Sequence, residues 1–163
     1  STVPLSLKGA CERLLEDSSY AVIQTALTKL VQFFPSDAKT YLHKVKAIRG
    51  PHERVRIVRL EAEAADGSST ALSELSDLCG PGWEFITRQN AMGAMRRLST
   101  VTEDGARNIL NGLISTNTRL SSAAQATLAA LLEQPRLREV VRRVAQSMQV
   151  EQWQRDMLIP YSR

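Results

Sequence analysis

Two histidines, His43 and His52, are the residues of this chain best suited to metal chemistry. His52 and Glu53 begin the H-E-x-x-H pattern, in which two histidines one helical turn apart hold a catalytic zinc ion, but Arg56 stands where the second histidine belongs. His43 falls on the polar side of an expected helix over Ala38–Ile48, which is typical of a solvated side chain. The sequence therefore predicts no metal site and no cofactor in this chain.

Patterns for nucleophilic, phosphate-binding and paired-carboxylate chemistry are also missing. The sequence has no G-x-S-x-G motif, and Gly80-Pro81-Gly82 is too short and rigid for a phosphate loop, so it indicates a break between helices. Glu61 and Glu63 are two residues apart and lie on different helix faces, while Glu103 and Asp104 suit the first turn of a helix. We assign no catalytic residue, and we do not expect this chain to be an enzyme by itself.

Four arginines on one expected helix are the candidate binding residues: Arg136, Arg138, Arg142 and Arg143. Arg138 and Arg142 are four residues apart and share a face, and Glu139 can pair with Arg142 and Arg143 at spacings of three and four. One interpretation is a solvated outer face with intrahelical ion pairs. The other is a surface for an anion or an acidic partner.

The distribution of charge keeps the second interpretation open. The first 80 residues carry ten lysines and arginines against ten carboxylates, whereas the remainder carries eleven arginines and seven carboxylates, so the whole net charge of +4 lies in the second half. Arginine suits bidentate contacts with carboxylates and phosphates better than lysine does. Other arginines occupy corresponding places in earlier repeats and would extend a basic stripe: Arg54, Arg56, Arg59, Arg96 and Arg97.

Two cysteines, Cys11 and Cys79, form no metal motif. They fall about two repeats apart, beyond the reach of a disulfide, so we expect two buried thiols. No apolar run is long enough for a membrane span, and residues 1–4 show no signal peptide. We expect a soluble protein and leave cytoplasmic and periplasmic locations open. The chain lacks an initiator methionine, which suggests a processed product or a fragment of a larger protein.

Helices that recur with a step of about 33 residues must position all of these side chains. This rhythm predicts a single all-α domain over residues 1–163: a right-handed α-α superhelix, or HEAT-like solenoid, of about four helix pairs. A leading helix over Leu5–Glu16 and a helix over Glu151–Ile159 that caps the end with Trp153, Met157 and Leu158 complete it. The first helices of the pairs centre on Val22–Leu30, Val55–Glu63, Thr87–Met95 and Ala123–Leu131, and their partners start near Asp37, Ser69, Glu103 and Arg136.

The segment 54–60 is the one place where the pattern also fits a strand, because apolar and charged residues alternate. The residues that follow, Glu61-Ala62-Glu63-Ala64-Ala65, have strong helix propensity, and the repeat places a helix here. We therefore expect a helix over Glu53–Ala65.

Two runs carry a resemblance to a known family. One is Asp17-Ser18-Ser19-Tyr20-Ala21-Val22-x-x-x-Ala26-Leu27-x-x-Leu30, and the other is Trp83-Glu84-Phe85-x-x-Arg88-x-Asn90-Ala91-Met92-x-Ala94-Met95-x-x-Leu98. They resemble HEAT-type repeats, and more narrowly the HEAT-like helical domain that follows the catalytic domain in bacterial zinc aminopeptidases of the aminopeptidase N class. The resemblance covers most of residues 12–132.

The resemblance implies a non-catalytic C-terminal domain that packs on the catalytic domain of the same polypeptide and limits substrate access. The zinc would belong to the parent enzyme, since neither H-E-x-x-H nor the G-x-M-E-N loop occurs here. Its partners would be that catalytic domain, another protein, or a peptide substrate. The alternatives are a HEAT protein that binds nucleic acid through the Arg-rich second half, and a scaffold for a protein partner.

Overall fold

The computed structural model describes residues 5–163, and these residues form an all-helical protein without β-strands. The N-terminal residues 1–4, where the sequence shows no signal peptide, lie outside the described part. Two short 3-10 helices, η1 (Pro35–Asp37) and η2 (Pro51–Glu53), accompany the α-helices. The α-helices are α1 (Leu5–Leu14), α2 (Tyr20–Phe33), α3 (Ala38–Lys44), α4 (Arg54–Ala65), α5 (Ser69–Leu78), α6 (Phe85–Leu98), α7 (Glu103–Leu113), α8 (Thr118–Leu131), α9 (Pro135–Ser147) and α10 (Gln152–Ser162).

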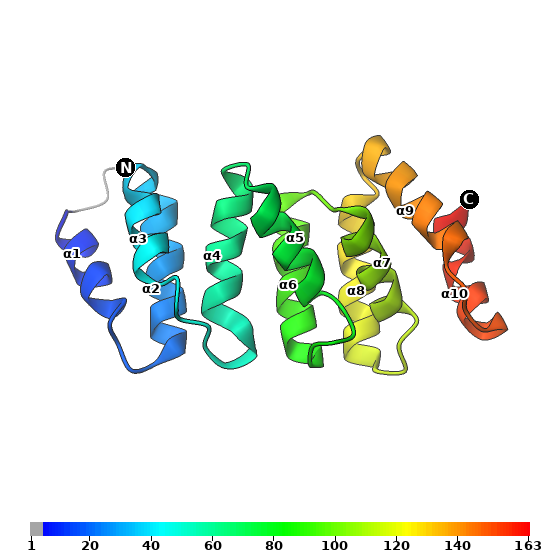
Figure 1. Ribbon diagram of the computed structural model, residues 1–163, viewed down its shortest axis with the longest axis horizontal. Coiled ribbons are helices and arrows are strands. Elements are labelled where there is room, and N and C mark those ends of the chain that lie inside the picture. Colours follow the sequence, from blue (N-terminus) through cyan, green and yellow to red (C-terminus); the bar gives the residue numbers. More distant parts are fainter. Residues whose placement is uncertain (1–4) are drawn as a thin grey trace.

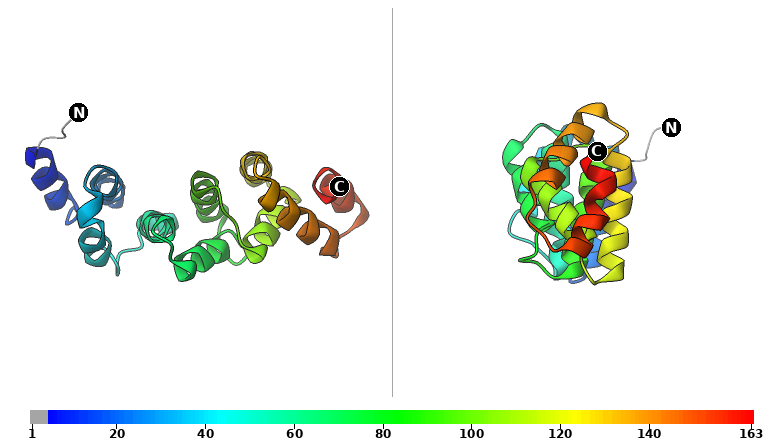
Figure 2. Two further views of the ribbon diagram at one scale, coloured as in Figure 1. Left: turned by 90° about the horizontal axis from the view of Figure 1, so that it is seen from above. Right: turned by 90° about the vertical axis from the view of Figure 1, so that its right-hand side faces the viewer.

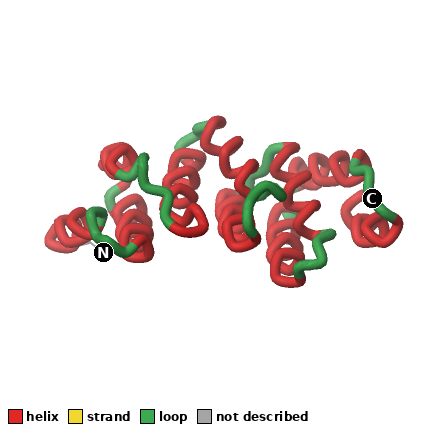
Figure 3. The backbone as a smooth tube through the Cα atoms, turned by 60° about the horizontal axis from the view of Figure 1, so that its bottom comes forward, coloured by secondary structure: helices red, strands yellow, loops and turns green. Residues whose placement is uncertain are grey.

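The helices stand side by side in two rows. Helices α2, α4, α6 and α8 pack against one another in sequence order, and α5, α7 and α9 do the same in front of them (Figure 1). Seen from above, the rows give an elongated, bowed molecule with α1 at one end and α10 at the other (Figure 2). Short loops join the helices along the whole length (Figure 3). None of the described helices is long and apolar enough to cross a bilayer.

Side-chain caps explain where most of the helices after α4 begin. Ser68, Thr102 and Asn117 accept hydrogen bonds from backbone N–H groups of the first turns of α5, α7 and α8. Glu84 does the same for α6 with two N–H groups. Pro135 starts α9, where its missing N–H costs nothing.

The segment 54–60 is helical, as the repeat predicts. Its strand-like pattern has a structural reason: α4 packs against α2, α5 and α6, so burial extends around most of the helix. Val55, Ile57 and Leu60 are buried, and so is Arg59.

The helix expected over Ala38–Ile48 is shorter than predicted, because α3 ends at Lys44. The residues after Val45 turn with i to i+3 hydrogen bonds instead of continuing the helix. Three residues of the connection that leads to α4 have positive φ angles. They are Gly50, His52 and Glu53, at 74°, 58° and 54°. Such angles are unfavourable for residues other than glycine, so this connection is strained at His52 and Glu53.

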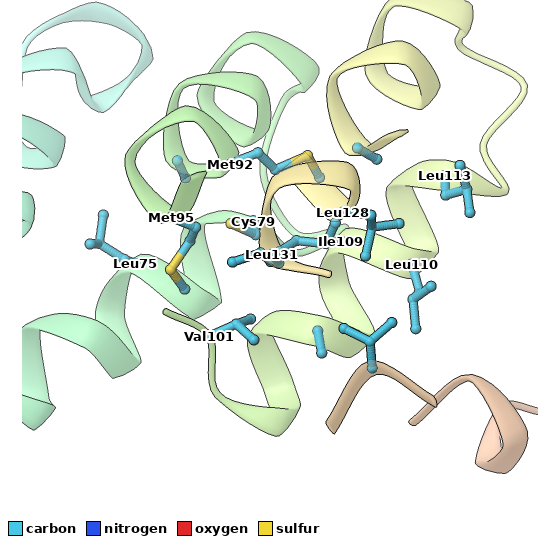
Figure 4. Close-up of a cluster of buried hydrophobic side chains, with 14 of the residues drawn as sticks. Leu75, Cys79, Met92, Met95, Val101, Ile109, Leu110, Leu113, Leu128 and Leu131 are labelled. Carbon is cyan, nitrogen blue, oxygen red and sulfur yellow. The ribbon is translucent and has the colours of Figure 1, made fainter. Parts of the chain in front are cut away.

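Two groups of buried side chains make up the core. The larger one runs from Ile57 to Leu158 and is built around Met92 and Met95 of α6 and Leu128 and Leu131 of α8 (Figure 4). The smaller one holds ten residues between Cys11 and Val55. Helix α4 contributes to both groups, so it is the element that joins α1–α3 to the rest of the protein.

The last helix caps the array less completely than predicted, and the first helix is also partly open. On α10 only Leu158 is buried, whereas Trp153 and Met157 are 45% and 36% exposed. On α1, Leu7 and Leu14 are likewise exposed. Each of these helices has a neighbour on one side only, so the apolar residues on its other side stay open.

Candidate protein-interaction surface

The four candidate arginines of α9 all reach the surface, but two of them are already paired. Arg142 makes a two-pronged contact with Glu139, at 2.7 and 3.0 Å, as the spacing predicts. Arg143 pairs instead with Glu103 of α7, at 2.8 Å, so it links two helices of one row. Arg138 donates to the carbonyl of Leu132, at 3.0 Å.

Arginines of the proposed basic stripe also meet carboxylates. Arg56 bonds both Glu53 and Glu74, Arg59 bonds Glu63, and Arg97 makes a bidentate pair with Glu61. Most of this positive charge is therefore balanced locally. These arginines therefore do not form a continuous surface of unpaired positive charge.

Buried Arg88 has a structural role. It is 7% exposed, and it donates to the carbonyl of Cys79 at 2.9 Å and to the side-chain oxygen of Asn111 at 3.0 Å. These bonds tie the α5–α6 turn and α6 to α7. Both cysteines are free and buried, as expected, and burial raises the pKa of Cys79 to about 12, which makes this thiol a poor nucleophile.

His52 contacts a helix cap. Its Nδ1 lies 2.8 Å from Oε1 of Glu84, the carboxylate that caps α6. Burial acts to raise the pKa of Glu84, but hydrogen bonds from Thr87, Ile86 and His52 outweigh it and hold the pKa at about 2. Among the residues that the structure describes, no three His, Cys, Asp or Glu side chains gather closely enough to hold a metal ion.

A large recess lies where the front row is interrupted. Helices α5, α7 and α9 pack closely on one another, but α3 does not pack extensively against α5. A recess of about 930 Å³, which we call the α3–α5 hollow, lies beside α3, between it and the α4–α5 turn. Its lining comprises Val31, Pro35, Ser36, Ala38, Lys39, Leu42, His43, Lys46, Ala62, Glu63, Ala65, Asp66, Gly67 and Ser68.

The two sides of the α3–α5 hollow carry opposite charge. Lys39, His43 and Lys46 contribute to it from α3 and the turn after it, and Glu63 and Asp66 contribute from the end of α4 and the turn that follows. The nearest approach between the two sides is 4.0 Å, from Nζ of Lys39 to Oδ2 of Asp66, and both side chains are largely exposed. An exposed pair of this kind contributes little to stability, so both charges are available to a partner.

A second recess of about 610 Å³ lies on the other side of the same junction, between α2, α4 and the end of α6. It shares Val31, Ala62 and Ala65 with the α3–α5 hollow. The apolar residues at the ends of α2 and α4 therefore line both recesses.

Sequence reasoning missed the α3–α5 hollow. Lys39, His43 and Lys46 are spaced by four and three, which is a helix face, but that pattern looks the same on any solvated helix. What leaves the hollow open is the lack of extensive packing between α3 and α5, and no sequence motif marks it. The chain was compared with models of protein families, with curated proteins and with solved structures, and none of the three comparisons found a match.

Proposed function

We propose that this chain is a HEAT-like α-solenoid module that binds a segment of a partner protein in the α3–α5 hollow. The observation that carries the proposal is the break in the front row, where α3 and α5 leave a recess lined by apolar side chains and by opposite charges. The pairwise stacking of helices in two rows supports the solenoid interpretation. Recesses with apolar lining and a few charged groups are the usual form of binding sites in proteins.

The charged residues of the α3–α5 hollow indicate which kind of segment would bind there. A segment lying in the hollow would place apolar side chains on Val31, Leu42 and Ala62. It would direct carboxylates towards Lys39 and Lys46, and basic groups towards Asp66, because Glu63 is already bonded to Arg59. This order of charges gives orientation and specificity more than raw affinity.

Selection of displayed peptides on the immobilised chain, followed by fluorescence anisotropy with one selected peptide, tests this proposal. We expect selected sequences to combine apolar and acidic residues. The double substitution Lys39→Glu with Lys46→Glu should weaken binding by about tenfold, since two attractive charges become repulsive. The matched control is Arg136→Glu, an exposed charge reversal on α9. If that control abolishes binding and the lysine variant does not, the site lies on α9 and the proposal is wrong.

The family resemblance supplies a finer form of the proposal. In this form the chain is the helical domain of a zinc aminopeptidase of the aminopeptidase N class, where it packs on the catalytic domain and limits substrate access. The resembling runs, with Tyr20 and Val22 in one and Arg88 and Asn90 in the other, support it. The isolated chain should then leave aminoacyl substrates intact in the presence of zinc, and hydrolysis by it would contradict this form.

Nucleic-acid binding is the alternative that gains least from the arrangement of charges, because Arg56, Arg97 and Arg142 are already bonded to carboxylates. A salt titration separates the two functions. Binding through several phosphates weakens steeply as salt is added. Absence of DNA and RNA binding at low salt eliminates the alternative.

A further inference from the structure

In the described part of the chain, exposed large apolar side chains occur on α1, α2 and α10. Within residues 5–163, helices α3 to α9 carry none. An array of stacked helices normally ends in helices with polar outer faces, which keep it from sticking to other molecules. Here both ends depart from that rule. The exposed residues are Leu5, Leu7 and Leu14 on α1, Tyr20 and Phe33 at the ends of α2, and Trp153, Met157 and Ile159 on α10.

One end presents an apolar ridge. Trp153, Met157 and Pro160 of α10 are four and three residues apart and are all exposed, on the side away from buried Leu158. This spacing is the one with which an amphipathic helix inserts into a groove. Asp156 lies beside the ridge, and its carboxylate is bonded only to the amide of Gln152, at 2.9 Å, with no ion pair among the described residues.

The other end presents an apolar groove. A recess of about 340 Å³ lies between α1 and α2. A basic group lines it: the ammonium of Lys29 lies 5.5 Å from the centre of the Phe33 ring and has no ion pair within residues 5–163. The lining comprises Cys11, Leu14, Ala21, Val22, Thr25, Ala26 and Lys29.

We propose that two copies of this chain associate head to tail, with the α10 ridge of one copy seated in the α1–α2 groove of the next. The apolar ridge and the apolar groove match, and Asp156, which has no ion pair among the described residues, is complementary in charge to Lys29. Helix α10 lies at the opposite end of the elongated molecule from α1 and α2 (Figure 1), so a single copy does not bring the ridge and the groove together. The contact is heterologous, and it propagates from copy to copy as a ring or a filament.

Sedimentation velocity over a wide range of concentrations tests the proposal on the intact chain. The wild-type mass should rise with concentration. Leu14→Glu blocks the groove and Met157→Glu blocks the ridge, so each variant alone should stay at the monomer mass. Mixed together they should form a one-to-one dimer of twice that mass, because each variant keeps the end that the other has lost. Arg136→Glu, on α9, is the matched control and should associate as wild type does.

Circular dichroism first confirms that each variant keeps its helical content. A wild-type chain that remains monomeric throughout overturns the proposal, and in that case other protein segments cover the two ends. A single variant that still dimerises also overturns it, because the contact is then between two like ends. For a variant that fails to fold, the pair Asp156→Arg and Lys29→Asp replaces it: each alone should weaken association, and the double charge exchange should restore it. None of these residues lines the α3–α5 hollow, so the result is independent of the proposed function.

Discussion

Single charged residues in this protein mostly hold helices in place. Glu84 shows this most clearly, because one carboxylate accepts hydrogen bonds from the backbone N–H groups of Ile86 and Thr87 and contacts His52 across the junction of η2 and α6. Arg88 has the same kind of role in the interior, where it reaches α7. The sequence pattern Trp83-Glu84-Phe85-x-x-Arg88 contains both residues, but it does not tell a structural carboxylate from a catalytic one. Their contacts decide that.

Replacing Glu84 by Ala should destabilise the protein by about 1 kcal/mol, the usual effect of losing a helix cap. The effect should depend on pH. The pKa of Glu84 is about 2 in the folded protein against an ordinary value of 4.5, so its contribution is complete above about pH 4.5 and is lost as the pH falls towards 2. Urea unfolding at several pH values between these limits measures it. If Glu84→Gln leaves the loss of stability at acid pH unchanged, the low pKa of Glu84 is not the cause of that loss.

Replacing Arg88 by Met should cost about 3 kcal/mol, because the buried carbonyl of Cys79 and the side-chain oxygen of Asn111 lose their donor. A lysine at this position cannot donate to the Cys79 carbonyl and to Asn111 at the same time, so Arg88→Lys should recover only part of the lost stability. Guanidinium unfolding at neutral pH measures both variants. Arg136→Met on the surface of α9 is the control, and an equal loss there would contradict the structural role of Arg88.

At the scale of elements, the sequence predicted the helices of the middle and C-terminal part closely, because repeat register, caps and apolar spacing agree there. Helix α4 is the clearest success, since periodicity alone was ambiguous. Helix α3 was overestimated, because Val45 and Ile48 continue an apolar spacing after the helix has ended. Of the three residues expected to cap the end, Leu158 is buried but Trp153 and Met157 stay exposed, since spacing identifies a face but not whether a neighbour covers it.

Two glycines, one within α6 and one in the turn before it, should respond oppositely to the same substitution. Gly93 lies within α6, where a methyl group would meet only the flexible tip of Arg97 at 3.4 Å, so Gly93→Ala should stabilise the protein by about 0.5–1 kcal/mol. Gly80 lies in the α5–α6 turn, where the methyl group would be 2.9 Å from the backbone oxygen of Asp77. Gly80→Ala should therefore destabilise it by about 1–3 kcal/mol.

Thermal unfolding followed by circular dichroism compares the two glycine variants with wild type. The expected order of melting temperatures is Gly93→Ala above wild type and wild type above Gly80→Ala. The reverse order of melting temperatures would show that the backbone at Gly80 shifts at little cost to accommodate the methyl group, and would contradict the prediction.

The whole molecule is divided at α4, and this division has consequences for both proposals. The ten buried residues of the smaller core, from Cys11 to Val55, join the larger core through the packing of α2 on α4, and the α3–α5 hollow leaves the front row open. The strained connection at His52 and Glu53 lies at the start of α4, and the hollow lies at its end. Neither the division nor the hollow follows from a 33-residue rhythm, because the rhythm describes repeats as equivalent. The α3–α5 hollow and the α1–α2 groove both belong to the part with the smaller core.

Hydrogen exchange should reveal this division, because stacked helices with few contacts across a boundary open in separate units. Backbone amides of α1–α3 should exchange faster than those of α6–α8, whose helices share the larger core. Val45→Ala, in the smaller core, should speed exchange in α1–α3 and leave α7–α9 unchanged, whereas Leu128→Ala should act on α6–α9. Mass spectrometry of peptic fragments measures both. If either variant speeds exchange equally along the whole chain, the protein opens as one cooperative unit and α4 is no boundary. If the division holds, a ligand in the α3–α5 hollow should slow exchange in α3 and around the α4–α5 turn, because it supplies the contacts that the front row lacks there.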